Sequence, residues 1–328
     1  MRFIKLFSLL LLFILVALFL FLYKVSYRFT DEKFGAKYVV KYRASMVFAF
    51  YNNHFIQEDI ISELVGVEKT FMRNKPFSEI SFFNKNRDVE IRVSPEFYSV
   101  LSFGSKLYEV SQGAWDPSAF PLLKLTKENK VSPNFEQLEQ AKKSVGYNNI
   151  IILNDNFVRK QLPDLQVDFS SILSGHIVDK IAHALDSYGV KNYMVHYETV
   201  SLAKGKGKSI KGWKVETGYP LIVSGDAKVH TSIYLQNSAM SSLRITQSNN
   251  DPRYIDPRNG CQVSSNIFQI NVVAPSGKIS QGMACALLIM GNKDGLASLT
   301  RLKGVEAIIL NSKIDGMFYS KSAGFPLD

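Results

Sequence analysis

The sequence predicts an α+β fold, in which a single domain of mixed strands and helices follows one N-terminal transmembrane helix. Three observations support this prediction: an uncharged apolar N-terminus, apolar residues at helical spacing in the first half, and strand-like segments in the second half. These elements do not alternate regularly, which argues against a parallel βαβ sheet. The 46% hydrophobic content is ample for a core and excludes wholesale disorder.

The N-terminal segment is long enough to cross a membrane. Residues 6–23 are eighteen consecutive positions without a charge, and as a helix they would span roughly 27 Å, close to the hydrocarbon thickness of a bilayer. The segment ends in L-F-L-Y-K-V-S-Y, a poor site for signal cleavage, and it carries no cysteine for a lipid anchor. Residues 1–23 are therefore predicted to be an uncleaved signal anchor with the domain outside the cytoplasm, on the periplasmic side. A cleaved signal peptide is the alternative.

Local patterns predict the elements behind this anchor. Polar residues 24–37 predict a short spacer, and the aromatic and β-branched residues of 38–50 predict a strand. Two amphipathic helices are predicted from apolar residues spaced three or four apart, which are Ile56, Ile60, Leu64, Val67 and Phe71 in the first and Val178, Ile181, Leu185 and Tyr188 in the second, closed by Gly189. Ser132 and Pro133 predict the start of a helix that Gly146 ends.

The second half is predicted to be rich in strands. The expected strands are residues 193–197, 213–217, 267–274, 305–310 and 317–320. No break in composition marks a second domain, so one domain is expected over residues 38–328.

The net charge of +10 raises the question of a nucleic-acid partner. The lysines are scattered, however, and the one dense run, from Lys204 to Lys211, is interleaved with glycine. We therefore expect no nucleic-acid partner. The run is interpreted either as a solvated loop or as a surface that lies against acidic lipid head groups of the membrane.

Four segments carry recognisable motifs in a fixed order. They are S-E-I-S-F-F-N at 78–84, G-A-W-D-P-S at 113–118, D-F-S-S-I-L-S-G-H-I-V-D at 168–179, and R-Y-I-D-P-R-N-G at 253–260. In order and spacing they resemble the motifs of the ApbE family, the FAD:protein FMN transferases. The resemblance covers nearly the whole chain behind the anchor.

The resemblance implies a reaction and its cofactors. Members of this family bind FAD, place Mg²⁺ on its pyrophosphate, and transfer FMN to a Thr or Ser hydroxyl of a target flavoprotein, with release of AMP. The implied cofactors are thus FAD and Mg²⁺. The implied partners are the membrane and a flavoprotein acceptor, such as a subunit of a membrane electron-transfer complex.

Matching the motifs position by position gives the candidate site. The candidate catalytic residues are Asp256, Arg258 and Arg253, the last at the family's histidine position. The candidate cofactor-binding residues are Ser78, Glu79, Asp116, Asp168, Ser174, His176, Glu198, Met240 and Ser241. The candidate metal positions are Ser171, through its carbonyl, with Gln281 and Cys285 on a later helix. Some have simpler interpretations, because Asp116 and Asp168 suit capping and 256–260 is common turn chemistry.

Several of these positions depart from the family pattern. Gln281 replaces an aspartate and Cys285 a threonine, and neither a neutral amide nor a soft thiol is a good replacement ligand for Mg²⁺. In addition, Ser174 replaces a lysine, His176 a tyrosine, and Glu198 a glycine that lets backbone approach the cofactor. His176 is interpreted as a structural residue, with replacement of a lost catalytic group as the alternative.

These departures lead to two main hypotheses. One is an active transferase with a rebuilt metal site, and the other is a homologue with reduced or lost activity that binds a flavin or a protein partner. An unrelated membrane-anchored binding domain is the third hypothesis, which the four ordered motifs disfavour. Because Cys261 and Cys285 both fall in site segments, a disulfide across the cleft is a further hypothesis.

Overall fold

A large antiparallel sheet forms the centre of the molecule in the computed structural model, which describes residues 2–128, 135–222, 229–245, 254–263, 265–313 and 316–327. Within these residues, eight strands pair in the order β1-β2-β6-β7-β10-β11-β12-β13. Their bounds are Lys24–Lys33, Ala36–Ser45, Tyr193–Tyr197, Val200–Lys204, Ser238–Arg244, Ile267–Ala274, Glu306–Lys313 and Gly316–Lys321. Neighbouring strands are antiparallel throughout.

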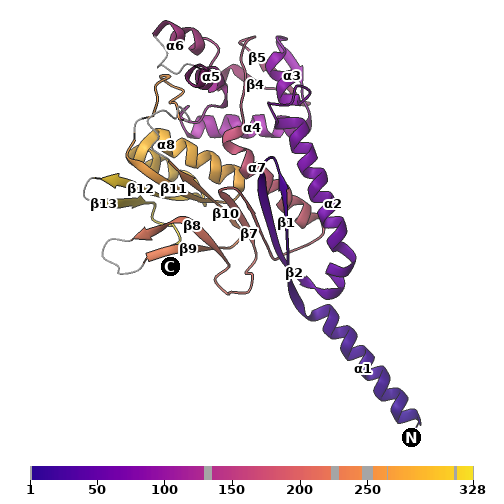
Figure 1. Cartoon of the computed structure of the whole chain (residues 1–328). Coiled ribbons are helices and arrows are strands. Elements are labelled where there is room, and N and C mark those ends of the chain that lie inside the picture. Colours follow the sequence, from indigo (N-terminus) through magenta and orange to yellow (C-terminus); the bar gives the residue numbers. More distant parts are fainter. Residues whose placement is uncertain are drawn as a thin grey trace.

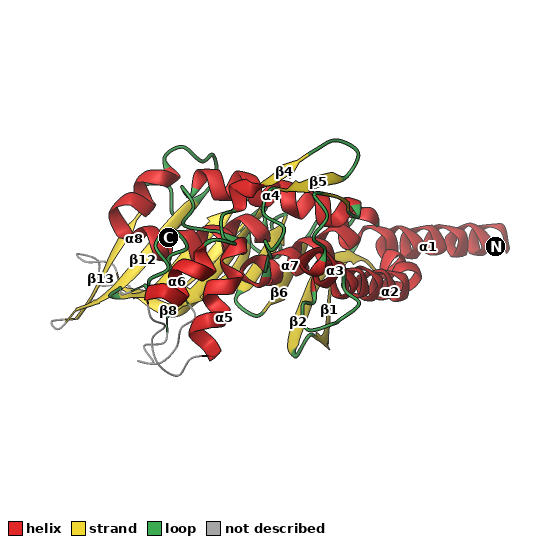
Figure 2. Ribbon diagram, turned by 90° about the horizontal axis from the view of Figure 1, so that it is seen from above, coloured by secondary structure: helices red, strands yellow, loops and turns green. Residues whose placement is uncertain are grey.

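Helices cover one face of this sheet (Figures 1 and 2). The described α-helices are α1 Arg2–Leu22, α2 Met46–Phe71, α3 Glu79–Lys85, α4 Pro95–Val110, α5 Phe120–Glu128, α6 Phe135–Lys142, α7 Ser170–Ser187 and α8 Gly277–Leu299, with 3-10 turns at Pro117–Ala119 and Tyr147–Asn149. The largest core cluster lies between the sheet and α2, α4, α7 and α8. Burial of this apolar surface is the main term that holds the fold together.

Two smaller sheets complete the fold. Strands β3 Glu90–Arg92, β5 Phe157–Lys160 and β4 Ile150–Ile152 form one of them, at the end of the molecule that carries α3 and α4. Strands β8 Trp213–Ile222 and β9 Val229–Leu235 form a hairpin that packs on the other face of the main sheet. The main sheet is therefore covered on both faces near β7 and β10.

Helix α1 projects away from the body and ends in the N-terminus (Figure 1). Its residues Phe3–Leu22 have a mean hydropathy of 2.9 and none of them is buried. By length and composition this helix could anchor the chain in a membrane or serve as a signal sequence. Strand β1 begins two residues after α1 ends, so the body starts immediately beside the apolar helix.

The spacer predicted for residues 24–37 is wrong, because Lys24–Lys33 form the edge strand β1. Val25, Tyr27 and Phe29 alternate with polar residues there, and Tyr27 and Phe29 pack against the core. This period of two is the signal of a half-buried strand.

The strand predicted for residues 38–50 ends early, at Ser45. The Ser45 hydroxyl accepts a hydrogen bond from the Phe48 amide at 3.2 Å and so caps the N-terminus of α2. Residues 46–50 are therefore helical, and the apolar stripe from Ile56 to Phe71 is buried as the spacing predicts.

The other element predictions hold where they can be compared. The strands at 193–197 and 267–274 are confirmed to the residue, and those at 213–217, 305–310 and 317–320 lie within or overlap β8, β12 and β13. The predicted start of a helix at Ser132 and Pro133 lies outside the described residues. The α+β fold class is confirmed.

Candidate functional site

The candidate site is a cavity of about 510 Å³ between the start of α7, α8, α5 and the sheet. Its lining combines polar groups with apolar and aromatic side chains. The lining residues are Arg73, Phe120, Leu123, Lys124, Asp168, Ser170, Ser171, Thr199, Ser241, Leu243, Tyr254, Gln281 and Cys285. Five of the residues predicted from the sequence are brought together here, namely Asp168, Ser171, Ser241, Gln281 and Cys285.

A close crossing of α7 and α8 positions one wall of the cavity. A Cβ atom added at Gly175 would lie 2.2 Å from the Gly277 carbonyl oxygen, so the two backbones touch at this point. The Asp179 carboxylate accepts hydrogen bonds from the Gly277 and Lys278 amides at 2.6 and 3.1 Å, which ties α7 to the first turn of α8. Burial raises the pKa of Asp179, although these amide donors oppose the rise.

Two side chains of α8, those of Gln281 and Cys285, contact the backbone of α7 near this crossing. The Gly175 amide donates to Gln281 Oε1 at 2.7 Å. The Cys285 thiol lies 3.7 Å from the Ser171 carbonyl oxygen, and the Ser171 hydroxyl accepts from the Trp115 indole at 3.0 Å. Burial raises the pKa of the Cys285 thiol to about 12, so the sulfur stays protonated and neutral.

Arg73 lies across the opposite side of the cavity. Its Nε atom is 3.3 Å from an Asp168 carboxylate oxygen, and its guanidinium stacks 3.9 Å from the centre of the Phe120 ring. Asp168 also accepts from the amide of Ser170, the first residue of α7, at 2.9 Å, although the N-cap residue of the helix is Phe169. One carboxylate thus both orders the start of α7 and holds a cation at the cavity.

The loop at 254–263 contributes Tyr254 to the cavity, whereas Asp256 and Arg258 pair with each other. Arg258 donates to both Asp256 oxygens at 2.8 Å, and the Arg258 amide donates to the same carboxylate at 3.0 Å. The Gly260 amide bonds to the Asp256 carbonyl at 2.8 Å, and Gly260 has a positive φ of 77°. This arrangement is the tight turn expected of the sequence. Arg253 lies outside the described residues.

Four other predicted residues do not line the cavity, and their contacts are structural. Ser78 caps α3, and Glu79 accepts from the Ser94 amide and hydroxyl, each at 2.5 Å. Asp116 accepts from the Ser118 amide and hydroxyl at 2.7 and 2.6 Å. Met240 is buried in the core beneath the β8–β9 hairpin.

Comparison with known proteins shows where this fold and cavity belong. The family described as the ApbE family matches residues 34–309. Over 312 residues the chain is 30% identical to the FAD:protein FMN transferase of Haemophilus influenzae, an alignment that covers 90% of this chain and 88% of that protein. The chain belongs to the ApbE family.

Other members support the same assignment. The FAD:protein FMN transferase of Vibrio cholerae is 26% identical over 307 residues, or 89% of each chain. The solved structure of the flavin transferase ApbE from Vibrio cholerae superposes with a TM-score of 0.80 at 22% identity, covering 92% of this chain and 99% of that one. The apo flavinyl transferase ApbE of Pseudomonas stutzeri also gives 0.80 at 21% identity, covering 92% and 96%. At this identity the structures establish a common fold.

The side chains at the two α8 positions that the sequence resemblance assigns to metal, Gln281 and Cys285, are not the ligands that a magnesium ion prefers. Mg²⁺ needs hard oxygen ligands, usually including a carboxylate. Here the Gln281 oxygen is already bonded to an amide and Cys285 is a protonated thiol. Across the described ranges, no group of three or more His, Cys, Asp or Glu side chains is arranged to hold a metal.

Two further positions that depart from the ApbE pattern contact each other. The Ser174 hydroxyl donates a hydrogen bond to the Glu198 carboxylate. Glu198 has a positive φ of 50°, a conformation that favours glycine. The Glu198 backbone thus adopts a conformation that favours glycine, while its side chain bonds Ser174 on α7.

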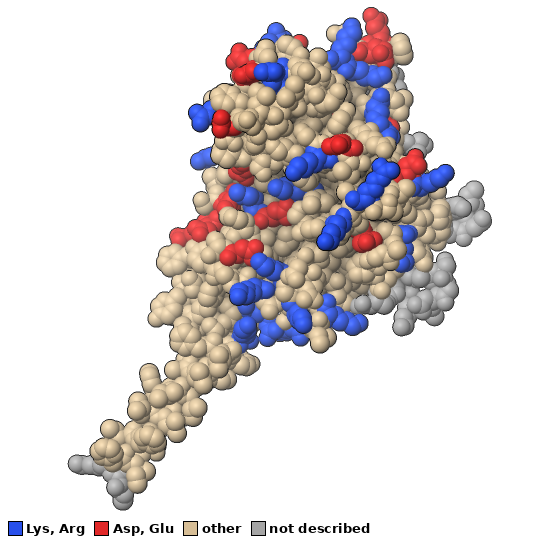
Figure 3. Space-filling model, turned by 180° about the vertical axis from the view of Figure 1, so that it is seen from behind, with Lys and Arg blue, Asp and Glu red and all other residues tan. Residues whose placement is uncertain are grey.

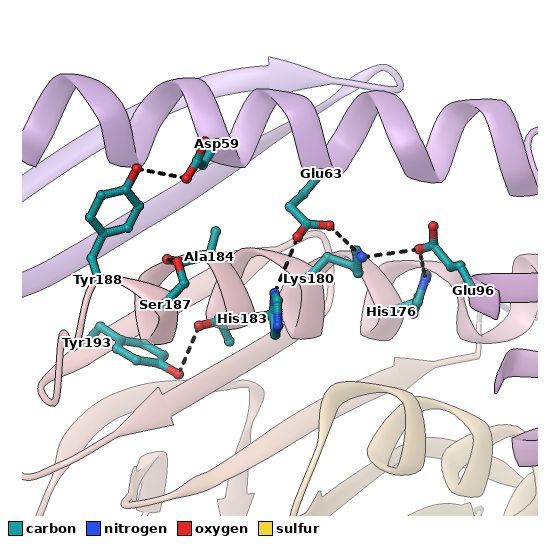
Figure 4. Close-up of polar contacts among 11 residues, drawn as sticks. Asp59, Glu63, Glu96, His176, Lys180, His183, Ala184, Ser187, Tyr188 and Tyr193 are labelled. Atoms are coloured by element: carbon teal, nitrogen blue, oxygen red, sulfur yellow. Dashed lines mark hydrogen bonds and ion pairs between the residues drawn. The ribbon is translucent and has the colours of Figure 1, made fainter.

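His176 belongs to a charged cluster between α2, α4 and α7 (Figure 4). Its Nε2 lies 3.0 Å from Glu96, and Lys180 bridges Glu96 and Glu63 at 3.5 and 2.5 Å. Burial lowers the pKa of His176 despite Glu96, and Nδ1 is buried without a partner, so a second ring proton would be unpaired. The neutral His176 ring donates a hydrogen bond to Glu96. Burial raises the pKa of the Glu96 carboxyl, but the hydrogen bond from His176 and the charge of Lys180 outweigh burial and hold this pKa below its usual value. His176 is therefore engaged by Glu96 and is not among the residues that line the cavity.

The disulfide hypothesis is wrong for this structure. Both Cys261 and Cys285 are free thiols, and Cys261 is exposed whereas Cys285 bonds a carbonyl.

Sequence reasoning missed eight of the thirteen residues that line the cavity. Phe120 and Leu123 follow directly after the motif at 113–118, and Tyr254 lies within the motif at 253–260, so motif proximity was an available signal for them. Arg73 has no such signal, because it lies outside the motifs and is brought to the cavity only by its place just after the end of α2.

Proposed function

We propose that this chain is a membrane-anchored ApbE-family protein that keeps a flavin-binding cleft but has lost magnesium-dependent FMN transfer. The observation that carries this proposal is the state of the metal positions. Gln281 and Cys285 are both uncharged, and each is engaged by a backbone group of α7. A pyrophosphate at this place would lack the divalent metal ion that assists phosphoryl transfer.

The walls of the cavity support flavin binding. Phe120, Tyr254 and Leu243 offer aromatic and apolar surface suited to a planar ring system. Arg73 and Lys124 bring positive charge to the same cavity, and a guanidinium is well suited to phosphate. FAD bound noncovalently is therefore the proposed ligand.

The location and partner follow from the same proposal. We infer that α1 stays in the membrane as an uncleaved anchor, with the domain on the periplasmic side. The partner would be a membrane flavoprotein, which this chain would bind without modifying. A C-terminal alkaline phosphatase fusion tests the orientation, since it should be active only if the domain is exported.

The central experiment combines two measurements on the full chain in detergent. FAD binding is followed by calorimetry without metal, and FMN transfer is followed as covalent flavin on an acceptor carrying the family's target motif, with Mg²⁺ present. The Haemophilus influenzae transferase serves as the positive control. We expect FAD binding and no covalent flavin; transfer at the control's rate would overturn the loss of activity, and absence of FAD binding would overturn the ligand.

A double variant tests the physical reason. Gln281→Asp with Cys285→Thr restores the hard oxygen donors, so FAD affinity should become dependent on Mg²⁺, by about tenfold or more. Gln140→Asp adds the same charge on the exposed face of α6 and should leave FAD affinity independent of the metal. If the double variant shows no metal dependence, the two substitutions are not what excludes magnesium.

A further inference from the structure

A second cavity lies on the opposite face of the main sheet from α7 and α8, next to the β8–β9 hairpin. It has a volume of about 410 Å³ and is lined by Ser26, Tyr27, Arg28, Lys41, Met194, Lys208, Ser209, Gly212, Trp213, Lys214 and Tyr234. We call it the basic pocket, because four of these side chains are cationic and no carboxylate lines it. The proposed activity makes no use of it.

The four cations of the basic pocket are not neutralised by the protein. Arg28, Lys41, Lys208 and Lys214 take part in none of the ion pairs found in the described part of the chain. Arg28 also stands directly opposite Lys41 in the β1–β2 register. Like charges in that position destabilise a strand pair, so folding alone gives no reason for them.

The glycine-rich segment that carries Lys208 is held in place. Arg43 donates to the Gly207 carbonyl at 2.5 Å, and the Trp213 indole donates to the Lys204 carbonyl at 3.0 Å. Gly207 has a positive φ of 62°, and a Cβ atom there would lie 3.0 Å from the Trp213 ring. The segment predicted as a solvated loop is therefore fixed against the sheet, with its lysine at a defined pocket.

The basic pocket lies at the end of the body that carries α1. Arg28 is on β1, which begins two residues after α1 ends. Figure 3 shows Lys and Arg side chains gathered along the edge of the body next to the base of this helix. At the start of α2, which contacts α1, Phe50, Tyr51 and Phe55 are 83%, 66% and 54% exposed. Exposed aromatic rings beside an apolar helix are typical of the membrane–water interface.

We propose that the basic pocket binds the phosphate-bearing head group of an anionic phospholipid in the membrane that holds α1. Arg28 and Lys41 would contact the phosphate from the sheet, and Lys208 and Lys214 from the loop and hairpin. The rings of Trp213 and Tyr234 line the same pocket and suit the glycerol and ester region at the interface. Such binding would fix how the cleft faces the membrane.

The test uses Trp213, which lies in the basic pocket, as its own reporter. The chain has two tryptophans, and the other, Trp115, is buried in the core. The full chain is placed in phosphatidylcholine nanodiscs, and Trp emission is followed as phosphatidylglycerol replaces part of the lipid. A second arm adds inorganic phosphate to pure phosphatidylcholine nanodiscs, and Trp213→Phe identifies the part of the signal that belongs to the pocket.

We expect phosphatidylglycerol, and not inorganic phosphate, to change the emission of Trp213. Arg28→Gln with Lys41→Gln should weaken the response by about 30-fold, since each cation near an anionic surface is worth about 1 kcal/mol. The matched control Lys69→Gln with Lys303→Gln removes the same charge from exposed sites on α2 and after α8, and should respond like the native chain.

Each other outcome overturns the proposal. No response to phosphatidylglycerol means that no lipid binds there, and an equal response to inorganic phosphate means a site for free anions. An equal loss in the control variant means a diffuse effect of net charge. If the Arg28 and Lys41 variant melts far below the native chain, Lys208→Gln with Lys214→Gln replaces it, because both side chains are exposed.

Discussion

The crossing of α7 and α8 can be tested with one methyl group, by the substitution Gly175→Ala. The added Cβ would lie 2.2 Å from the Gly277 oxygen, 2.4 Å from the Gly277 carbon and 2.8 Å from the Lys278 nitrogen. Ordinary contact begins near 3.4 Å, so the shortest of these distances is 1.2 Å too small. All three atoms are backbone, so no side chain can rotate to relieve the overlap.

The magnitude follows from what must move. Helix α8 can withdraw only by stretching the two amide hydrogen bonds to Asp179. Overpacking costs about 1–3 kcal/mol, and weakening a hydrogen bond to a charged group costs about 1.5 kcal/mol or more. Alanine returns about 1 kcal/mol of helix propensity. We expect a net loss of about 3 kcal/mol, which lowers the Tm of a chain of this size by about 5 °C.

The assay is thermal unfolding of the full chain in detergent, followed by circular dichroism. The matched control is Gly66→Ala on α2, where the nearest atom to an added Cβ is a Glu96 oxygen at 3.8 Å. That variant should gain up to about 1 kcal/mol from helix propensity. If Gly175→Ala melts within about 2 °C of the native chain, the close crossing is not present in the folded protein.

Two further predictions concern His176 and the cysteines. Because burial holds the pKa of His176 below 6.5 in the folded state, its contribution to stability is present above that pH and is lost as the pH falls below it. The Tm of the native chain should therefore fall more steeply between about pH 7.5 and 5.5 than the Tm of His176→Gln. The control His183→Gln changes an exposed site and should behave like the native chain. Equal slopes for the native chain and His176→Gln would contradict a neutral buried ring. For the cysteines, a thiol reagent should modify only Cys261 in the folded protein. After denaturation without reductant, the reagent should modify both thiols. If it then modifies neither, the two cysteines form a disulfide.

The sequence was sufficient for those parts of the fold that repeat a local pattern. The stripe on α2 could be found because its spacing of three or four residues persists over several turns, and the strands β6 and β11 because each is a short run rich in aromatic or β-branched residues. Strand β1 was missed because its alternation is carried by only three inward residues among polar ones. The boundary at Ser45 was missed because a cap depends on one hydrogen bond rather than on a pattern.

The cavity was harder to predict than the fold. Motif matching found the positions on α7 and α8, because their spacing along a helix fixes which face they share. It could not separate residues that line the cavity from those that support it. Glu79 and Asp116 belong to the matched motifs, but their carboxylates accept hydrogen bonds from nearby backbone amides and hydroxyls. Arg73 could be found only from the folded chain, through its pairing with Asp168.

Two positions that depart from the family pattern, Glu198 and Gln281, contact α7, and these contacts affect whether substitutions could restore FMN transfer. Glu198 accepts from Ser174, and Gln281 accepts from the Gly175 amide in the next residue of α7. These two partners are adjacent residues of α7, so we expect the effects of reverting Glu198 and Gln281 to be non-additive. Glu198→Gly alone would take away the carboxylate that Ser174 bonds, and Gln281→Asp alone would bring a shorter acceptor to the same amide. Under the proposed function, a gain of Mg²⁺ binding should require at least Gln281 and Cys285 to change together, because the second ligand position remains a partly buried neutral thiol until it does.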